Sequence, residues 1–132
     1  MHSSAVIVPA VLAACERFGG DGEAALRGIV AGVETLCRLC FVRPKAIHKA
    51  GFHPTSILGS MASTVAVSAA LGLNRRQMVD ALGNAGSLAS GIIEYLAEGA
   101  WTKRLHAGWA SRVGIQAARI GQNGFQIGRA HV

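Results

Sequence analysis

The sequence predicts an all-α fold in which helices pack closely through small side chains. No stretch of the 132 residues alternates apolar and polar side chains over the length of a strand. Hydrophobic residues make up 51% of the chain but aromatic residues only 5%, and there are 17 glycines. This composition suits helices whose backbones approach one another closely. The length is sufficient for one domain with a modest core.

The first part of the chain predicts two helices and a loop. Pro9 fits the first turn of a helix over residues 8–18, and two glycines end that helix. Asp21 is a suitable N-cap residue for a second helix that reaches about Phe41. Residues 42–51 are expected to form a basic loop.

A third helix is expected from Pro54 to Leu71. Residues 54–74 carry no charged side chain, so a membrane span has to be considered. Serine and threonine recur along this stretch, and the large aliphatic residues are too few to favour lipid strongly. A helix buried among other helices explains the stretch better, so we expect no membrane association.

The last part of the chain predicts three more helices. Asn74 and Gln77 form a capping box at the start of a fourth helix. Glycines then loosen the pattern, and we expect a break near Gly91. A short helix over 92–96 follows, and a last helix runs from about 102 to 121.

The formal net charge is +6, and the basic residues are scattered along the chain rather than run together. Such a distribution gives little support to nucleic-acid binding, and it fits a site for small anions equally well. We therefore expect a small anionic ligand and no nucleic-acid partner.

Three cysteines occur, at positions 15, 37 and 40. An odd number in a chain with no signal peptide indicates reduced thiols and a cytoplasmic location. Cys37 and Cys40 resemble half of a metal knuckle, but a zinc site needs a second pair of ligands. Both also fall inside a predicted helix, where buried thiols are common core residues. We expect no metal and no cofactor.

The last seven residues, 126–132, read QIGRAHV and resemble the translation of a common sequencing adapter. The alternative is a native tail. We interpret the segment as a non-native tail, so His131 is not a candidate site residue.

Lys103 and His106 stand one turn apart at the start of the last predicted helix, on a face otherwise made of small residues. The free N–H groups and the positive dipole end of that helix lie beside them. Together these groups would hold a carboxylate or a phosphate. The alternative is a lysine extended to solvent and a histidine hydrogen-bonded at the helix end. Arg104 points to a different side and is expected to be solvated or salt-bridged.

His53 stands immediately before Pro54, which favours an extended backbone at His53 and places its imidazole at the mouth of the third helix. Thr55 and Ser56 add hydroxyl groups beside the same helix start, and both are candidate substrate-binding residues. The alternative for His53 is a capping or core histidine. His2, at the start of the chain, says little by itself.

Four motifs follow one another in a specific order: HSSAVIVPAVLAACE, GFHPTSILGS, ALGNAGSLASGIIEY and GAWTKRLHAGWAS. Together they resemble the MmgE/PrpD family, which includes 2-methylcitrate dehydratase and cis-aconitate decarboxylase. The resemblance covers residues 2–125. The family combines a large all-helical domain with a smaller lid domain. Residues 1–125 are therefore interpreted as a partial helical domain, an interior piece of a longer protein.

The resemblance implies roles for four residues. His2 matches a motif histidine, although Ser3 stands where the family usually has proline. His53 matches the histidine of the Gly-Phe-His-Pro motif. Lys103 matches the active-site lysine, and His106 the histidine that accompanies it. The family's Asp-Asp-Thr motif would precede His2, and further basic and tyrosine site residues would follow residue 125, so this piece is expected to hold part of an active site.

The resemblance implies a cofactor-independent lyase that acts on small di- or tricarboxylates, of the 2-methylcitrate dehydratase type and homodimeric in the longer protein. Dehydration needs cations to hold carboxylates, a base for the proton beside a carboxylate, and an acid for the departing hydroxyl. Lysine and histidine supply these functions near neutral pH. Decarboxylation of cis-aconitate would use the same groups, and the residues do not decide between the two. A helical interaction module without catalytic activity is a further alternative.

Overall fold

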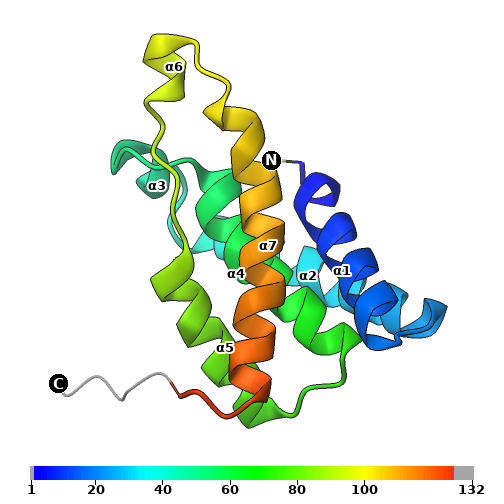
Figure 1. Ribbon diagram of the computed structural model, residues 1–132. Helices are drawn as coiled ribbons and strands as arrows, with labels where there is room; N and C mark the ends of the chain where they lie inside the picture. The colour runs from blue at the N-terminus through cyan, green and yellow to red at the C-terminus, as the bar shows by residue number, and fades with distance from the viewer. Residues whose placement is uncertain (1, 127–132) are drawn as a thin grey trace, which may run out of the picture.

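The computed structural model describes residues 2–126, and within that range the chain forms seven helices joined by short connections (Figure 1). They are α1 (Ser4–Phe18), α2 (Gly22–Val42), α3 (Ala46–Lys49), α4 (Pro54–Ala70), α5 (Arg75–Leu88), α6 (Tyr95–Glu98) and α7 (Thr102–Gln122). The only pairing of extended backbone among the described residues is an isolated antiparallel bridge between Phe52 and Ile92. The all-α prediction is confirmed. Of the expected non-native tail, residues 127–132 lie outside the described range.

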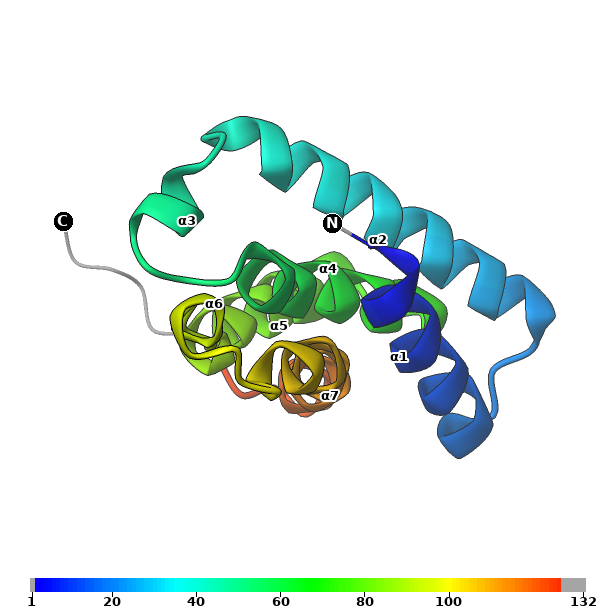
Figure 2. The same cartoon turned by 90° about the horizontal axis from the view of Figure 1, so that it is seen from above.

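Helix α4 lies at the centre of the bundle. Seen from above, it runs between α2 and α7, with α1 alongside (Figure 2), and it packs against all three and against α5. Its buried residues are nearly all small, and glycines of the neighbouring helices meet them. A Cβ atom on Gly28 of α2 would lie 2.6 Å from the carbonyl oxygen of Ala66. The small residues of α4 and of its neighbours therefore set the distances between the helix axes.

Apart from the half-buried Thr55, the serine and threonine residues of α4 are buried, and most of their hydroxyl groups donate to backbone carbonyl groups. Ser60 and Thr64 donate to carbonyl oxygens one turn earlier, each at 2.7 Å. Ser63 donates across to the carbonyl oxygen of Ala110 on α7, also at 2.7 Å. Such bonds remove most of the cost of burying a hydroxyl group. The uncharged stretch is thus a buried helix, and no helix in the described range is long and apolar enough to cross a membrane.

One cluster of the apolar core lies between α1, α2 and α4. Ile7 and Val11 are fully buried against Ala62 and Ala66 of α4, and Leu36 of α2 joins them. Ser111 of α7 adds a hydrogen bond between the helices, because its hydroxyl group donates to the carbonyl oxygen of Val6 in α1 at 2.7 Å. These contacts hold the start of α1 beside the first half of α7.

The prediction for the first helix was wrong about its beginning. Helix α1 starts at Ser4, so Pro9 lies inside it and not in its first turn. Proline removes one backbone hydrogen bond from a helix interior and crowds the preceding turn. Here Pro9 is exposed, and the helix continues because Val6 and Ile7, ahead of the proline, are buried in the core.

Two further predictions need correction. The expected loop over 42–51 contains the single turn of α3, which begins after Lys45 in a left-handed conformation with φ of 65°. The expected short helix over 92–96 begins three residues later, as α6, because the backbone at Ile92 pairs with Phe52 instead.

The remaining boundaries agree with the sequence. Asp21 accepts a hydrogen bond from the backbone N–H of Ala24 at 2.8 Å. Asn74 and Gln77 form both bonds of the capping box, each at 3.0 Å. The break near Gly91 is also present, since α5 ends at Leu88 and the next helix is the short α6.

Candidate active site

The backbone around His53 pairs with a segment that follows α5. His53 has an extended conformation, with φ of −86° and ψ of 113°, and Pro54 is the first residue of α4. The backbone N–H of His53 donates to the carbonyl oxygen of Gly91 at 2.9 Å, and that of Ile93 donates to Gly51 at the same distance. These bonds fix the loop before α4 against residues 91–93.

The imidazole of His53 meets that of His106, which lies one turn inside α7. The two Nδ1 atoms are 2.9 Å apart and the ring centroids 5.1 Å apart. Both residues are buried, with exposed fractions of 8% and 7%. A hydrogen bond forms between the two Nδ1 atoms when one ring is protonated at Nδ1 and the other is not. The two histidines that the sequence singles out separately thus form one buried pair.

Tyr95 of α6 is the third ring of the site, and it is not among the residues predicted from the sequence. Its ring lies edge-on to His53, with centroids 5.1 Å apart at 67°, and edge-on to His106 at 5.6 Å and 72°. It is the only tyrosine of the chain, and it ends one of the four family-like motifs. Its uniqueness in the chain and its place in the motif are the two features of the sequence that could have identified it.

Lys103 lies at the edge of this cluster. It is exposed, one turn before His106 on α7, and its Nζ atom is 6.0 Å from the centroid of the Tyr95 ring. No side chain caps the N-terminus of α7. Arg104 is turned elsewhere, with its guanidinium group 4.2 Å from the centroid of the Trp101 ring. Of the two cationic residues at the start of α7, Lys103 is therefore the one that lies next to the buried rings.

The environment keeps both imidazoles neutral near pH 7. Burial lowers the pKa of His53 to about 4, assisted by the positive charges that His106, Lys103 and His48 carry when protonated. Burial also lowers the pKa of His106. For Tyr95, burial raises the pKa of the phenol. In each case the low-polarity surroundings disfavour the charged form.

The other predicted site residues are His2, Thr55 and Ser56. They either lie apart from this cluster or form a hydrogen bond with the backbone. His2 is exposed, and no hydrogen bond within the described range joins its side chain to the histidine pair. Thr55 is half-buried. Ser56 is buried, and its hydroxyl donates to the carbonyl oxygen of Ser90, which fastens the segment after α5 to the start of α4.

A cavity of about 470 Å³ adjoins the site behind α4, between the end of α2, α3 and the start of α4. Its walls are mainly apolar, and the basic residues of its lining are Arg43, Lys45 and His48. The cavity shares Pro54 with the loop of His53, but the histidine pair is not part of its lining. Within residues 2–126, no three side chains of the kinds that bind metals gather into a potential metal site.

Comparison with known proteins identifies the family. The model of the MmgE/PrpD N-terminal domain matches residues 1–131. Cis-aconitate decarboxylase of Aspergillus terreus is 30% identical over 137 residues, an alignment that covers 96% of this chain and 27% of the relative. Cis-aconitate decarboxylase of Homo sapiens is 32% identical over 130 residues, with 95% and 27% covered. The chain thus spans about a quarter of the length of these relatives. It belongs to the MmgE/PrpD family.

Proposed function

We propose that this chain is the helical part of a cofactor-independent lyase acting on small polycarboxylates. The observation that carries the proposal is the buried, neutral pair of His53 and His106 beside the exposed ammonium group of Lys103. A proton-handling pair next to a cation matches what elimination from a carboxylate substrate requires.

The hydrogen bond between the two Nδ1 atoms gives the two rings opposite roles. A neutral imidazole carries one proton, on Nδ1 or on Nε2. The ring that donates through Nδ1 therefore has an unprotonated Nε2, which can accept a proton. The ring that accepts at Nδ1 has its proton on Nε2, which can donate. One base and one acid result whichever histidine of the pair is the donor.

The cation supplies the binding energy for the anionic substrate. The ammonium group of Lys103 is exposed, so it can bind a carboxylate without a large cost of desolvation. The uncapped N-terminus of α7 offers backbone N–H groups to the same anion. A carboxylate held at this point would lie beside the histidine pair, which is the arrangement needed for proton removal next to a carboxylate.

Two reactions are compatible with these groups. In dehydration of the 2-methylcitrate type, the base removes the proton beside a carboxylate and the acid protonates the departing hydroxyl. In decarboxylation of the cis-aconitate type, the carboxylate leaves as carbon dioxide and the acid protonates the resulting carbanion. The names of the relatives favour the second reaction. We therefore take decarboxylation of the cis-aconitate type as the first candidate and retain dehydration of the 2-methylcitrate type as the second. A homodimer and a cytoplasmic location belong to the proposal as well.

The test is an assay of the complete protein encoded by its gene with 2-methylcitrate, citrate and cis-aconitate. We expect turnover of at least one of them, unchanged by chelators, and a loss of at least 100-fold in kcat/KM for Lys103→Ala. Arg104→Ala is the matched control, because it removes the neighbouring cation that lies over Trp101. Absence of turnover of all three compounds would instead favour a helical module without catalytic activity, and equal turnover by Lys103→Ala and the native protein would remove Lys103 from the site.

A further inference from the structure

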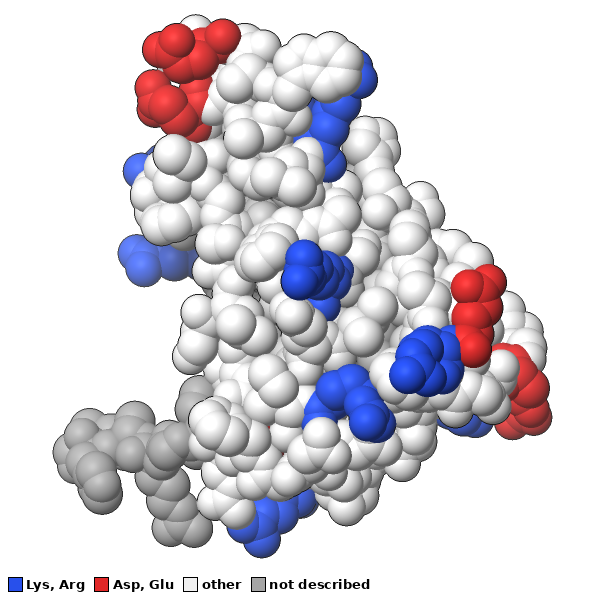
Figure 3. Space-filling view, in the orientation of Figure 1, with Lys and Arg blue, Asp and Glu red and all other residues white. Residues whose placement is uncertain are grey.

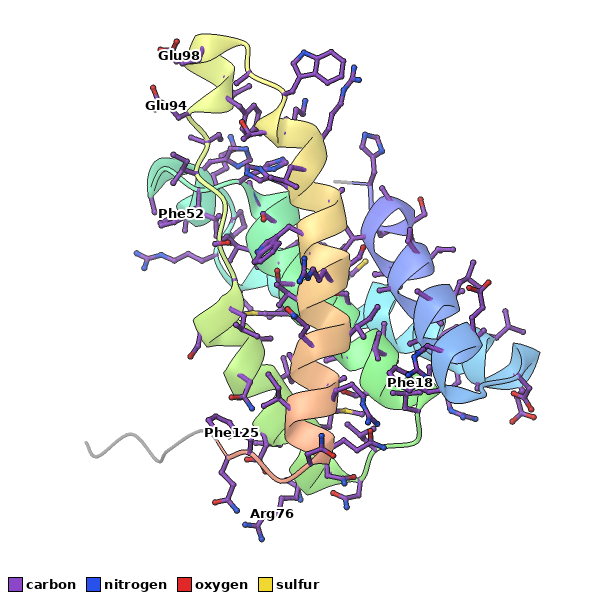
Figure 4. All side chains as sticks on the ribbon, viewed as in Figure 1. Phe18, Phe52, Arg76, Glu94, Glu98 and Phe125 are labelled. Carbon is purple, nitrogen blue, oxygen red and sulfur yellow. The ribbon has the colours of Figure 1, made fainter. Side chains whose placement is uncertain are left out.

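Tyr95 is the buried residue of an otherwise exposed turn. Its exposed fraction is 7%, whereas Leu96 next to it is 65% exposed and the rest of α6 is exposed as well. Figure 4 shows Glu94 and Glu98 pointing outward at the tip of the same turn. A single turn gains little stability from its own hydrogen bonds. The burial of one aromatic side chain is therefore the main packing contact that holds α6 in place.

The segment that carries Tyr95, which we call the strap (residues 89–101), is fastened at its root to the loop of His53. Three hydrogen bonds join them: from the Ser56 hydroxyl to the carbonyl oxygen of Ser90, from the backbone N–H of His53 to Gly91, and from that of Ile93 to Gly51. Every one of these bonds ends within residues 51–56. The strap is thus positioned by the same few residues that position the catalytic histidine.

We infer that Tyr95 is a positioning residue for the pair of His53 and His106, and that its aromatic ring rather than its hydroxyl group performs this role. The inference rests on the function proposed above. The ring covers one side of both imidazoles in edge-on contact, so it fixes the planes of the two rings and excludes water from them. The ammonium group of Lys103 lies 6.0 Å from the same ring, where the aromatic electrons attract it.

The charges around the pair are consistent with this role. The groups that act on His53 are His106 and Lys103 from α7 and His48 from α3, and all three are cationic when protonated. The start of α4 carries no charged side chain, since Pro54 is followed by Thr55 and Ser56. Glu94 and Glu98, the carboxylates of the strap, point outward (Figure 4), and Figure 3 shows acidic side chains on the surface over α6. Among the described residues no carboxylate acts on the pKa of either imidazole, and burial, to which the Tyr95 ring contributes, is the first cause of both lowered pKa values.

The experiment compares Tyr95→Phe with Tyr95→Met in the complete protein. Phenylalanine keeps the ring, whereas methionine keeps much of the volume without the ring. The pKa values of His53 and His106 are measured by NMR on protein labelled in the imidazole carbon, and kcat and KM are measured across pH. Leu96→Ala is the matched control, because it truncates an exposed side chain on the same turn.

We expect Tyr95→Phe and Leu96→Ala to keep both histidine pKa values, with kcat within threefold of the native protein. In Tyr95→Met the pKa of His53 should rise from about 4 towards 6.5, and kcat should fall at least tenfold with KM changed less than threefold. A large loss of activity in Tyr95→Phe would overturn the inference in favour of a reacting hydroxyl group. Unchanged histidine pKa values in Tyr95→Met would overturn it too.

Folding and function are separated by two further measurements. Circular dichroism reports whether each variant folds, and Tyr95→Leu is the second variant without a ring. Failure of both Tyr95→Met and Tyr95→Leu to fold would assign Tyr95 a purely structural role and overturn the inference. Histidine titration needs no substrate, so a raised pKa without turnover of any polycarboxylate would contradict the proposed function and leave the positioning role standing.

Discussion

His53 and His106 are 53 positions apart in the chain, yet their Nδ1 atoms lie 2.9 Å from each other. The contact joins the residue before α4 to the first turns of α7, and it is buried on both sides. Protonation of either imidazole would place a charge inside the fold and would also end the neutral state of the pair. The stability of the fold and the chemistry of the site should therefore both respond to the titration of these two histidines.

The first prediction concerns stability against pH. The pKa of His53 is about 4 in the folded protein and about 6.5 in the unfolded chain, so the unfolded state binds more protons between these values. The contribution of His53 to the free energy of unfolding should therefore be fully present above about pH 6.5 and should be lost as the pH is lowered towards 4. At pH 5 the loss from this residue is about 2 kcal/mol relative to pH 7.5. Urea unfolding at the two pH values measures it.

The control for this experiment is His53→Gln, which removes the titrating group and keeps a polar side chain. Its free energy of unfolding should change less between pH 7.5 and pH 5 than that of the native protein. An identical urea midpoint for the native protein at both pH values would contradict the lowered pKa of His53.

The second prediction concerns activity against pH. The pair has one basic and one acidic Nε2 only while both rings are neutral. Because the pKa of His53 is about 4 and that of His106 is also lowered by burial, kcat/KM should remain high below pH 6.5, where an ordinary histidine becomes protonated. Initial rates across pH 4.5 to 8, with stability checked at each pH, test this. A half-maximal rate at pH 6.5 would contradict it.

The third prediction concerns the root of the strap. Gly91 has φ of +126°, and a Cβ atom there would lie 2.6 Å from the Ser56 hydroxyl oxygen and 3.2 Å from Cδ2 of His106. Gly91→Ala should therefore displace the strap, lower the free energy of unfolding by about 1–3 kcal/mol and reduce kcat/KM at least tenfold. Chemical denaturation and steady-state kinetics measure the two effects.

The control for the strap is Gly86→Ala, in an exposed helical position where a Cβ atom meets nothing within 4 Å. Alanine is the better helix former, so this variant should gain about 0.5–1 kcal/mol and keep its activity. If Gly91→Ala instead behaves like Gly86→Ala, the close approach of the strap to Ser56 matters neither for the free energy of unfolding nor for kcat/KM.

The sequence is sufficient to predict elements whose signals are local. The capping box of Asn74 and Gln77 starts α5, Asp21 starts α2, and Pro54 starts α4, since each acts within one turn of its own position. Pro9 led to a wrong start for α1. The neighbouring sequence looks the same whether a proline stands in the first turn of a helix or at an exposed position in its interior. Only the burial of Ile7 ahead of it decides between the two, and burial depends on the rest of the bundle.

The site shows the same division between local and distant causes. His53, Lys103 and His106 were selected by residue type and by resemblance, but the contact between the two imidazoles was not predicted. Tyr95 was missed because α6 is too short to leave a periodic pattern, and its place follows from bonds between the strap and residues 51–56. Such long-range contacts leave no signal at any fixed spacing along the chain.

The last prediction concerns the close approach of α2 to α4 at Gly28. A Cβ atom on Gly28 would lie 2.6 Å from the backbone oxygen of Ala66 and 2.9 Å from the Cβ atom of Ala70, and neither can move without shifting α4. Gly28→Ala should therefore lower the free energy of unfolding by about 1–3 kcal/mol, although alanine favours a helix more than glycine does.

Gly22→Ala is the matched control, at the exposed first residue of the same helix, where a Cβ atom meets nothing within 4 Å. Urea unfolding of the two variants separates helix propensity from packing. Because α4 begins at the loop of His53, a shift of α4 in Gly28→Ala should also reach the histidine pair and lower kcat/KM. A variant that is as stable as the native protein would mean that α2 can move away from α4 at little cost, and that the small residues between them do not set the distance.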